Sequence, residues 1–335
     1  MSPRFLLLVT GMLVLLSSIL YFVIDNYSFK AYSQLENQYI QSQNIKYFNS
    51  SSYPDFNFAV AGDFGCKPET QKTINNMVSK KPEIVIALGD LSYKNKADCW
   101  FSTVSPLDVG DKFKIAIGQH DIERNLTKYV EYMKHFNLTK PYYSFDFQNV
   151  HFLAMATAKN GLIPYLSGSD QYNFINADLN NANRSKNIDW IIVYSFRSFY
   201  SSNTTHPGQD ELQDLYHPLF EKYGVDVVFQ AHNHNYQRTY PLAYYPNNPS
   251  KPLILNKETE YYTGDQKGPI FITAGTGGET LHNFTGKAPF VIDQMTRNGF
   301  VNVDITQGGL NLTATFYDNE RMEAPDRFTI LKERK

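Results

Sequence analysis

Carboxylates and imidazoles follow directly on several short apolar runs of this sequence. Asp63 and Asp90 each follow a glycine at the end of such a run, and His232 and His234 stand two residues apart just after another. When strands with such endings share a sheet, their ends meet at one edge, where the side chains can bind one cation. The pattern therefore indicates a metal site at the edge of a sheet.

The order of these pieces resembles that of the calcineurin-like metallophosphoesterases. The chain contains in turn GDFG, GDLSY, GQHD and HNH, which begin at residues 62, 89, 118 and 232. The tyrosine of the second piece, Tyr93, narrows the resemblance to the purple acid phosphatases, in which a phenolate binds a ferric ion beside a divalent ion. The resemblance runs from about residue 57 to about residue 283. It implies an α/β (α+β) fold, a sandwich of two mixed β-sheets flanked by helices.

Four residues match, motif by motif, the family's ligands for the ferric ion: Asp63, Asp90, Tyr93 and His234. Two carboxylates and a phenolate suit a hard trivalent ion, and the imidazole completes the set. A lone aspartate after a strand is more often a turn or cap residue. The four residues together, in family order, favour metal binding, and iron is the ion expected at this first position.

The second metal position departs from the family pattern. The family holds this ion by the shared aspartate, the asparagine of GNH, a histidine after the next strand and the first histidine of His-x-His. Asp90 and His232 match two of these ligands, whereas Gln119 replaces the asparagine and Phe196 stands where the other histidine is expected. Glutamine keeps an amide oxygen, but a phenyl ring offers no ligand atom. Occupancy by a second divalent ion (iron, zinc or manganese) is therefore open.

Three repairs of the second position are conceivable. Water could fill the missing ligand position and leave a weak site, or His206 could move in as a ligand. Alternatively, Arg197 could place its guanidinium where the second cation would sit and bind substrate phosphate there. Both residues also have a plainer interpretation as surface residues without a ligand.

His120 stands where the family carries a histidine that contacts substrate phosphate, and Asp121 follows it as a possible orienting carboxylate. An imidazole with such a neighbour suits general acid catalysis. The resemblance thus implies a phosphoesterase that hydrolyses small phosphate monoesters through a metal-bound hydroxide, with a degraded second site. The alternative is an extracellular pseudophosphatase that binds phosphate or another ligand with weak catalysis or none.

Composition bears on the compartment and the partners. The 31 basic and 33 acidic residues nearly balance, and no basic run interleaves with aromatic residues, so the sequence does not support nucleic-acid binding. Residues 5–24 are uncharged, mostly apolar and long enough to span a bilayer, between Arg4 and Asp25. This predicts an uncleaved single-pass signal anchor in the cell membrane with the main domain outside. The alternative is a cleaved signal peptide and a secreted protein.

The chain is expected to divide into an anchor (1–24), a polar stalk (25–53), a metallophosphoesterase domain (54–320) and a C-terminal tail (321–335). Apolar runs bounded by turn residues predict strands. They lie at 56–61, 83–88, 114–117, 150–156, 190–194, 225–229 and 270–274. Helices are expected over 68–80 and 208–223, and the alternating runs 299–305 and 310–316 around two glycines predict a hairpin.

Two features concern the support of the site. Cys66 and Cys99 are the only cysteines, and an extracytoplasmic domain permits a disulfide, but the sequence leaves their pairing open. Tyr236 and Arg238 follow the paired histidines, and we interpret them as scaffold that braces the histidine loop.

Overall fold

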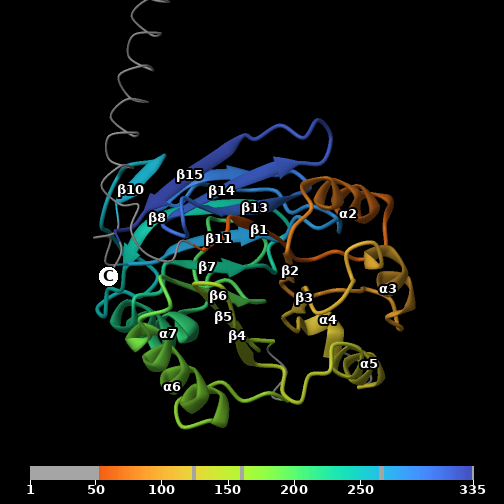
Figure 1. The fold of residues 1–335 in the computed structure, drawn as a ribbon, viewed down its shortest axis with the longest axis horizontal. Coiled ribbons are helices and arrows are strands. Elements are labelled where there is room, and N and C mark those ends of the chain that lie inside the picture. The colour runs from red at the N-terminus through yellow and green to blue at the C-terminus, as the bar shows by residue number, and fades with distance from the viewer. Residues whose placement is uncertain (1–52, 123–125, 159–161, 264–267, 334–335) are drawn as a thin grey trace, which may run out of the picture. The chain divides into compact units, whose positions relative to one another are not determined.

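The computed structural model describes residues 53–122, 126–158, 162–263 and 268–333, and residues 53–335 form a compact unit of their own. Two mixed β-sheets make up this unit (Figure 1). The first has the order β10 (Tyr261–Thr263), β15 (Asp326–Leu331), β14 (Asn311–Asp318), β13 (Gly299–Thr306), β1 (Phe56–Ala61), β2 (Ile84–Ala87), β3 (Phe113–Ile115). The second has the order β12 (Val291–Met295), β8 (Tyr236–Ala243), β11 (Ile270–Ala274), β7 (Val227–Gln230), β6 (Trp190–Ser195), β5 (Val150–Met155), β4 (Tyr143–Phe147), and β9 (Leu253–Ile254) pairs with β8.

The two sheets pack face to face over one apolar core. Phe58 and Val60 of β1 meet Phe152 and Ala154 of β5 in this core. The alternate residues of both strands, such as Leu153 of β5, point to the outer faces. Because helices cover those outer faces as well, the strands are apolar on both sides and appear in the sequence as continuous apolar runs.

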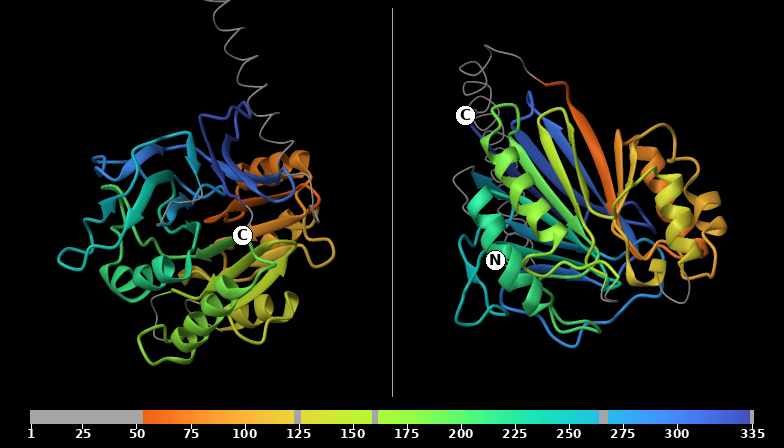
Figure 2. Two further views of the ribbon diagram at one scale, coloured as in Figure 1. Left: turned by 60° about the vertical axis from the view of Figure 1, so that its left-hand side comes forward. Right: turned by 90° about the horizontal axis from the view of Figure 1, so that it is seen from below.

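Helices cover the outer face of each sheet (Figure 2). Those against the first sheet are α2 (Pro68–Lys80), α3 (Asp98–Val104) and α5 (Thr127–His135), with the short α4 (Gln119–Ile122) nearby. Those against the second sheet are α6 (Asp170–Arg184) and α7 (Asp210–Tyr223). The described residues thus form a sandwich of two mixed sheets flanked by helices, as the family resemblance implies.

Several local predictions are confirmed. The helix expected over 68–80 is α2, with a proline in its first turn and Lys81 in a left-handed cap conformation (φ 51°). The helix expected over 208–223 is α7, which begins two residues later. Each of the seven predicted strand runs overlaps a strand, and β13 and β14 form the expected hairpin.

The prediction of a tail from residue 321 is wrong where it meets β15. This strand pairs antiparallel with β14 and parallel with β10, and its Phe328 and Ile330 enter the apolar core. Polar and apolar residues of this strand alternate only over residues 327–330, which is the shortest alternation that could indicate a strand in a sequence. Pairing with β14 positions it.

A buried histidine links the second sheet to a helix. His151 of β5 bonds Asp146 of β4 through Nδ1 at 2.6 Å and Asp178 of α6 through Nε2 at 2.8 Å. Burial lowers the pKa of His151, but the hydrogen bonds and charges of the two aspartates outweigh burial, so the net pKa is raised. Two carboxylate partners suit the protonated imidazolium, which donates from both nitrogens.

No helix within the described ranges is long and apolar enough to cross a membrane. The predicted anchor, and the stalk up to residue 52, lie outside the described residues.

Candidate metal centre

Two neighbouring strands deliver the candidate carboxylates. β1 and β2 are parallel, with Ala61 opposite Ala87, and Asp63 and Asp90 follow their ends. Both aspartates have a left-handed backbone conformation, with φ of 55° and 48°. The Asp63 N–H donates to the carbonyl of Gly89 at 3.0 Å, which ties the two turns together. The turns therefore present both carboxylates at the same edge of the sheet.

The second sheet delivers the imidazoles. His232 and His234 follow β7, and the His232 N–H donates to Asp63 Oδ2 at 3.0 Å across the sandwich. His234 Nδ1 lies 2.7 Å from the carbonyl oxygen of Thr280. Because a carbonyl only accepts, Nδ1 carries the proton in the neutral ring. Nε2 is then left with a lone pair, as a metal ligand requires.

The Tyr93 hydroxyl lies beside the other three predicted ligands of the first metal position. Its oxygen is 3.0 Å from Asp63 Oδ1, 3.3 Å from Asp90 Oδ2 and 2.9 Å from His234 Nε2. Ligand atoms at right angles around one ion, each about 2.1 Å from it, lie about 3 Å apart. Among the described residues, no group of three His, Cys, Asp or Glu side chains alone has the spacing for a metal ion. The phenol oxygen therefore belongs to the same cluster as the two carboxylates and the imidazole.

The charges of this cluster also fit a cation. Burial and the neighbouring aspartate charges raise the pKa of Asp90 well above its usual range. Burial and the charges of Asp63 and Asp90 likewise raise the pKa of Tyr93. Burial also raises the pKa of Asp63, but two nearby histidines outweigh it and the net pKa is lowered. Buried anionic oxygens without a cation are unfavourable, and a hard ion relieves that cost.

The structure brings His120 to the same edge. Its backbone N–H donates to Asp90 Oδ1 at 2.8 Å, its Nε2 lies 4.0 Å from Asp90 Oδ2, and its ring centre is 4.5 Å from that of Tyr93. Gln119, the preceding residue, begins α4. Gly118 lies so close to the backbone of Asp90 that a Cβ at this glycine would be 2.2 Å from the Asp90 nitrogen.

Asp121 binds the backbone of two turns. Its Oδ1 accepts the N–H of Leu91 at 2.9 Å, and its Oδ2 accepts the N–H of Gly118 at 2.8 Å. Burial raises the pKa of Asp121 to about 6. The carboxylate thus holds the Asp90 turn against the turn that carries His120.

At the predicted second metal position, aromatic and imidazole rings lie together where the family has a complete set of metal ligands. Phe196 is fully buried, and its ring centre lies 4.8 Å from that of His232. His206 stacks on His232 with ring centres 3.7 Å apart. The His206 N–H donates to Asn233 Oδ1 at 2.9 Å, which fixes this loop against the histidine loop. His206 and His232, the two histidines considered as ligands of the second metal, therefore lie side by side.

Sequence reasoning missed His282. Its ring stacks on His234 with centres 4.0 Å apart, and its Nδ1 accepts the His234 N–H at 3.2 Å. The His282 N–H in turn donates to the carbonyl of His234 at 2.9 Å. The loop after β11 brings it there, and a single histidine in that loop gives no pattern that could reveal it.

The comparisons with known proteins agree with this geometry. Residues 56–236 match the family model described as calcineurin-like phosphoesterase. The chain belongs to this family. Purple acid phosphatase 21 of Arabidopsis thaliana is 31% identical over 248 residues, which cover 68% of this chain and 51% of the relative. Purple acid phosphatase 22 of the same plant is 29% identical over 269 residues, which cover 75% and 57%. The phosphoesterase chain thus spans about half the length of these relatives.

Solved structures support the fold. A purple acid phosphatase from yellow lupin (Lupinus luteus) seeds, PPD1, superposes with a TM-score of 0.72 at 22% identity, covering 85% of this chain and 55% of that one. GAP50 of Plasmodium superposes with a TM-score of 0.62 at 14% identity, covering 84% and 90%. The expected resemblance to purple acid phosphatase-like metallophosphoesterases is confirmed.

A disulfide supports the first two loops of the phosphoesterase domain. Cys66, three residues after Asp63, is bonded to Cys99 of α3, which answers the question that the sequence left open. The hydroxyl oxygen of Ser92 lies 3.9 Å from one sulfur and 3.8 Å from the other. Because Ser92 precedes Tyr93, the disulfide lies against the loop that carries the phenol.

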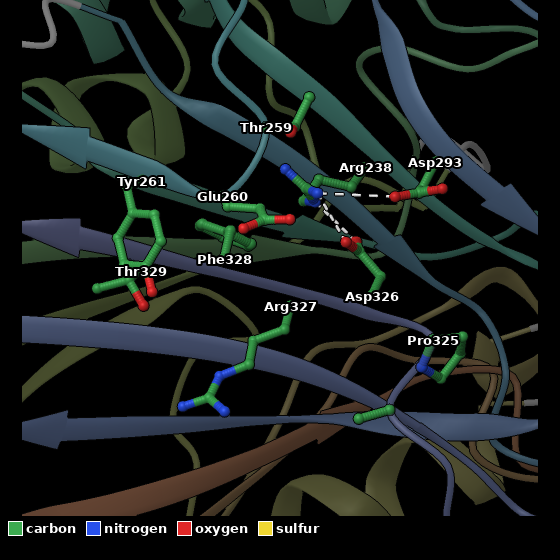
Figure 3. A pocket seen from close by; sticks show the side chains of 11 residues that line it. Arg238, Thr259, Glu260, Tyr261, Asp293, Pro325, Asp326, Arg327, Phe328 and Thr329 are labelled. Carbon is green, nitrogen blue, oxygen red and sulfur yellow. Dashed lines mark hydrogen bonds and ion pairs between the residues drawn. The ribbon is translucent and has the colours of Figure 1, made fainter. Parts of the chain in front are cut away.

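A buried ion pair joins the histidine loop to the first sheet. Arg238 of β8 donates from Nε and Nη2 to the two carboxylate oxygens of Asp326 in β15, both at 2.6 Å, and the Tyr236 hydroxyl donates to Asp326 at 2.6 Å. Arg238 and Asp326 also line a pocket of about 400 Å³ near the strands β10, β12 and β15, together with Asp293 (Figure 3). None of the predicted metal-site residues lines that pocket.

Proposed function

We propose that this chain is a phosphoric ester hydrolase of the purple acid phosphatase type that acts on small phosphate monoesters. One observation carries the proposal: carboxylate and imidazole ligand atoms gather within 3.3 Å of the Tyr93 hydroxyl, in a buried cluster at the strand ends. The names of the related plant enzymes support the reaction class.

In this proposal, iron is held by the residues of the first position: Asp63, Asp90, Tyr93 and His234. A cation there would supply Lewis-acid polarisation of the phosphoryl group and an activated water. Thr280 keeps the proton of His234 on Nδ1, so Nε2, which faces the Tyr93 hydroxyl, keeps its lone pair for binding. A second divalent ion, whether iron, zinc or manganese, would be held by Asp90, Gln119 and His232. We expect it to be held weakly, because Phe196 contributes no ligand atom.

His120 is assigned the proton transfer to the leaving alcohol. Its side chain is 37% exposed, so it can reach a bound ester, while its backbone N–H is fixed on Asp90. General acid catalysis of this kind contributes about 10²–10⁴-fold to rate. Asp121 acts through the backbone of Gly118 and so positions the turn that carries His120.

Hydrolysis of p-nitrophenyl phosphate by the purified full chain, from acid to neutral pH, tests this function. The Asp90→Asn and His120→Ala variants should each lose at least about a hundredfold in kcat. A matched control is Arg321→Lys, at an exposed position away from the candidate centre. Equal activity of all four proteins, or none in the metal-loaded wild type, would contradict the proposal.

The cellular location of the protein is a separate proposal. An anchor at residues 5–24 would hold the domain outside the cell membrane, and a secreted protein is the alternative. The Cys66–Cys99 disulfide supports an oxidising compartment. Protease treatment of intact cells should digest the domain if it lies outside. Protection in intact cells that is lost on permeabilisation would contradict this address.

A second candidate is a surface protein that binds phosphate or another ligand without hydrolysis. The buried phenyl ring of Phe196 beside His232 favours it, because this ring fills a position where the family places a metal ligand. One solved structure of similar fold is described as the anchor in the inner membrane complex of Plasmodium. Tight phosphate binding with one bound ion or none, and no turnover, would favour this candidate over the hydrolase.

A further inference from the structure

Arg197 is a buried guanidinium held by neutral groups. It directly follows Phe196, two residues after the end of β6, and is 8% exposed. Its Nη2 donates to the amide oxygen of Gln209 at 2.7 Å, and its backbone N–H donates to the hydroxyl of Thr157 at 2.9 Å. Neither partner carries a charge that could balance the guanidinium.

Within the part of the chain that the structure describes, the guanidinium has no counter-ion at ion-pair distance, and the charge of Glu211 acts on it only from farther away. No carboxylate there forms an ion pair with it, and its Nε is buried without a hydrogen-bond partner. Arg238 provides the contrast in the same domain, because its Nε and Nη2 both bind Asp326. A buried cation without a counter-ion is unfavourable unless an anion joins it.

The location of Arg197 indicates which anion this could be. The Phe196 ring packs on His232, and the Ala231 N–H donates to the carbonyl of Phe196 at 3.0 Å. The Ser198 hydroxyl donates to the carbonyl of Ala231 at 2.8 Å, so the two loops are fastened together. Gln209, the partner of the guanidinium, comes three residues after His206, and the His206 ring stacks on His232 with ring centres 3.7 Å apart. Arg197 thus belongs to the loop that borders the position lacking a complete set of ligands for a second cation, and its guanidinium binds the segment that carries His206.

We propose that Arg197 binds a phosphoryl oxygen of the substrate, and of the phosphate product, and so supplies the positive charge that a second cation would otherwise contribute. This rests on the proposed function for the location of the phosphate. A guanidinium binds phosphate oxygens through paired N–H donors. A phosphoryl oxyanion is a stronger acceptor than the neutral amide of Gln209, so it can replace that partner when substrate enters.

Two substitutions separate this role from a structural one. Arg197→Gln removes the charge. Gln209→Glu keeps the arginine but gives it an internal carboxylate at the position of its present 2.7 Å partner. If Arg197 binds phosphate, both variants should weaken binding of inorganic phosphate at least about tenfold, measured by calorimetry on the metal-loaded full chain. Arg184→Lys, at an exposed position in the last turn of α6, is the control and should bind phosphate as the wild type does.

The outcomes distinguish this inference from the hydrolase proposal. Unchanged phosphate affinity in a folded Gln209→Glu variant would overturn the role of Arg197, even if the wild type hydrolyses monoesters. Weakened phosphate binding in both variants would support it, even if the wild type shows no turnover. If Arg197→Gln does not fold, Gln209→Glu alone decides, because pairing the buried guanidinium with a carboxylate should stabilise the fold.

Discussion

The ion pair between Arg238 and Asp326 yields a quantitative prediction. It joins β8, whose first residue comes two positions after His234, to β15 in the other sheet. Arg238 and Asp326 are 1% and 5% exposed, and each oxygen of the carboxylate accepts a guanidinium N–H at 2.6 Å. We therefore expect this pair to hold the two sheets together beside the candidate centre.

Replacing Asp326 with alanine leaves a buried guanidinium without its main partner. Breaking a buried pair in this way costs about 3–5 kcal/mol of unfolding free energy. Asp293 lies 3.7 Å from Arg238 and can compensate in part, but its side chain is 41% exposed and solvent screens it. We therefore expect a loss near the lower end of the range, about 3 kcal/mol.

Urea unfolding of the full chain, followed by tryptophan fluorescence, measures this loss. Asp293→Ala is the matched control, because it removes the exposed carboxylate beside the same arginine and should cost under about 1 kcal/mol. Bound iron should also fall in Asp326→Ala as the histidine loop loosens. A loss below about 1 kcal/mol, or one equal to that of the control, would refute a role for this pair in joining the sheets.

Three further predictions concern other parts of the chain. Phe196→His combined with Gln119→Asn should raise the content of a second divalent metal in elemental analysis; unchanged content would show that these two positions do not limit the second site. Cys66→Ser combined with Cys99→Ser removes the disulfide between residues 33 positions apart and should lower the unfolding free energy, measured by chemical denaturation, by about 4 kcal/mol. A loss below about 1 kcal/mol would contradict a stabilising role of the disulfide. Because the folded pKa of His151 is raised, its stabilisation is fully present below the unfolded pKa of about 6.5 and is lost as pH rises through the folded value. The unfolding free energy lost in His151→Asn should therefore be larger at about pH 5.5 than at about pH 8.5, and the reverse order would contradict it.

The strands around the site could be predicted because their signals are local. β1 and β2 are apolar on both faces and end at Gly-Asp turns, so strand, turn and ligand all appear within a few residues. The histidines after β7 are likewise adjacent in sequence. The family resemblance then indicated that these motifs form one site and that the two sheets pack face to face. The hydrophobic periodicity of the sequence carries neither piece of information.

Other parts of the site depend on contacts between distant segments. β15 acquires its position from β14, and Asp326 within it binds Arg238 from 88 residues earlier. His282 reaches His234 only through the loop after β11. The sequence also suggested that Asp121 orients His120, but its two oxygens accept backbone N–H groups of neighbouring turns. Residue type alone does not separate a catalytic carboxylate from one that fixes a turn.

The visible absorption spectrum of the iron-loaded full chain, beside its iron content, tests the candidate centre most directly. A ferric ion held by the Tyr93 phenolate predicts about one iron per chain and a charge-transfer colour. That colour should disappear in Tyr93→Phe, measured at equal iron content. A colourless wild type with stoichiometric ferric iron, or a colour that survives in Tyr93→Phe, would contradict the assignment of Tyr93 as a ligand.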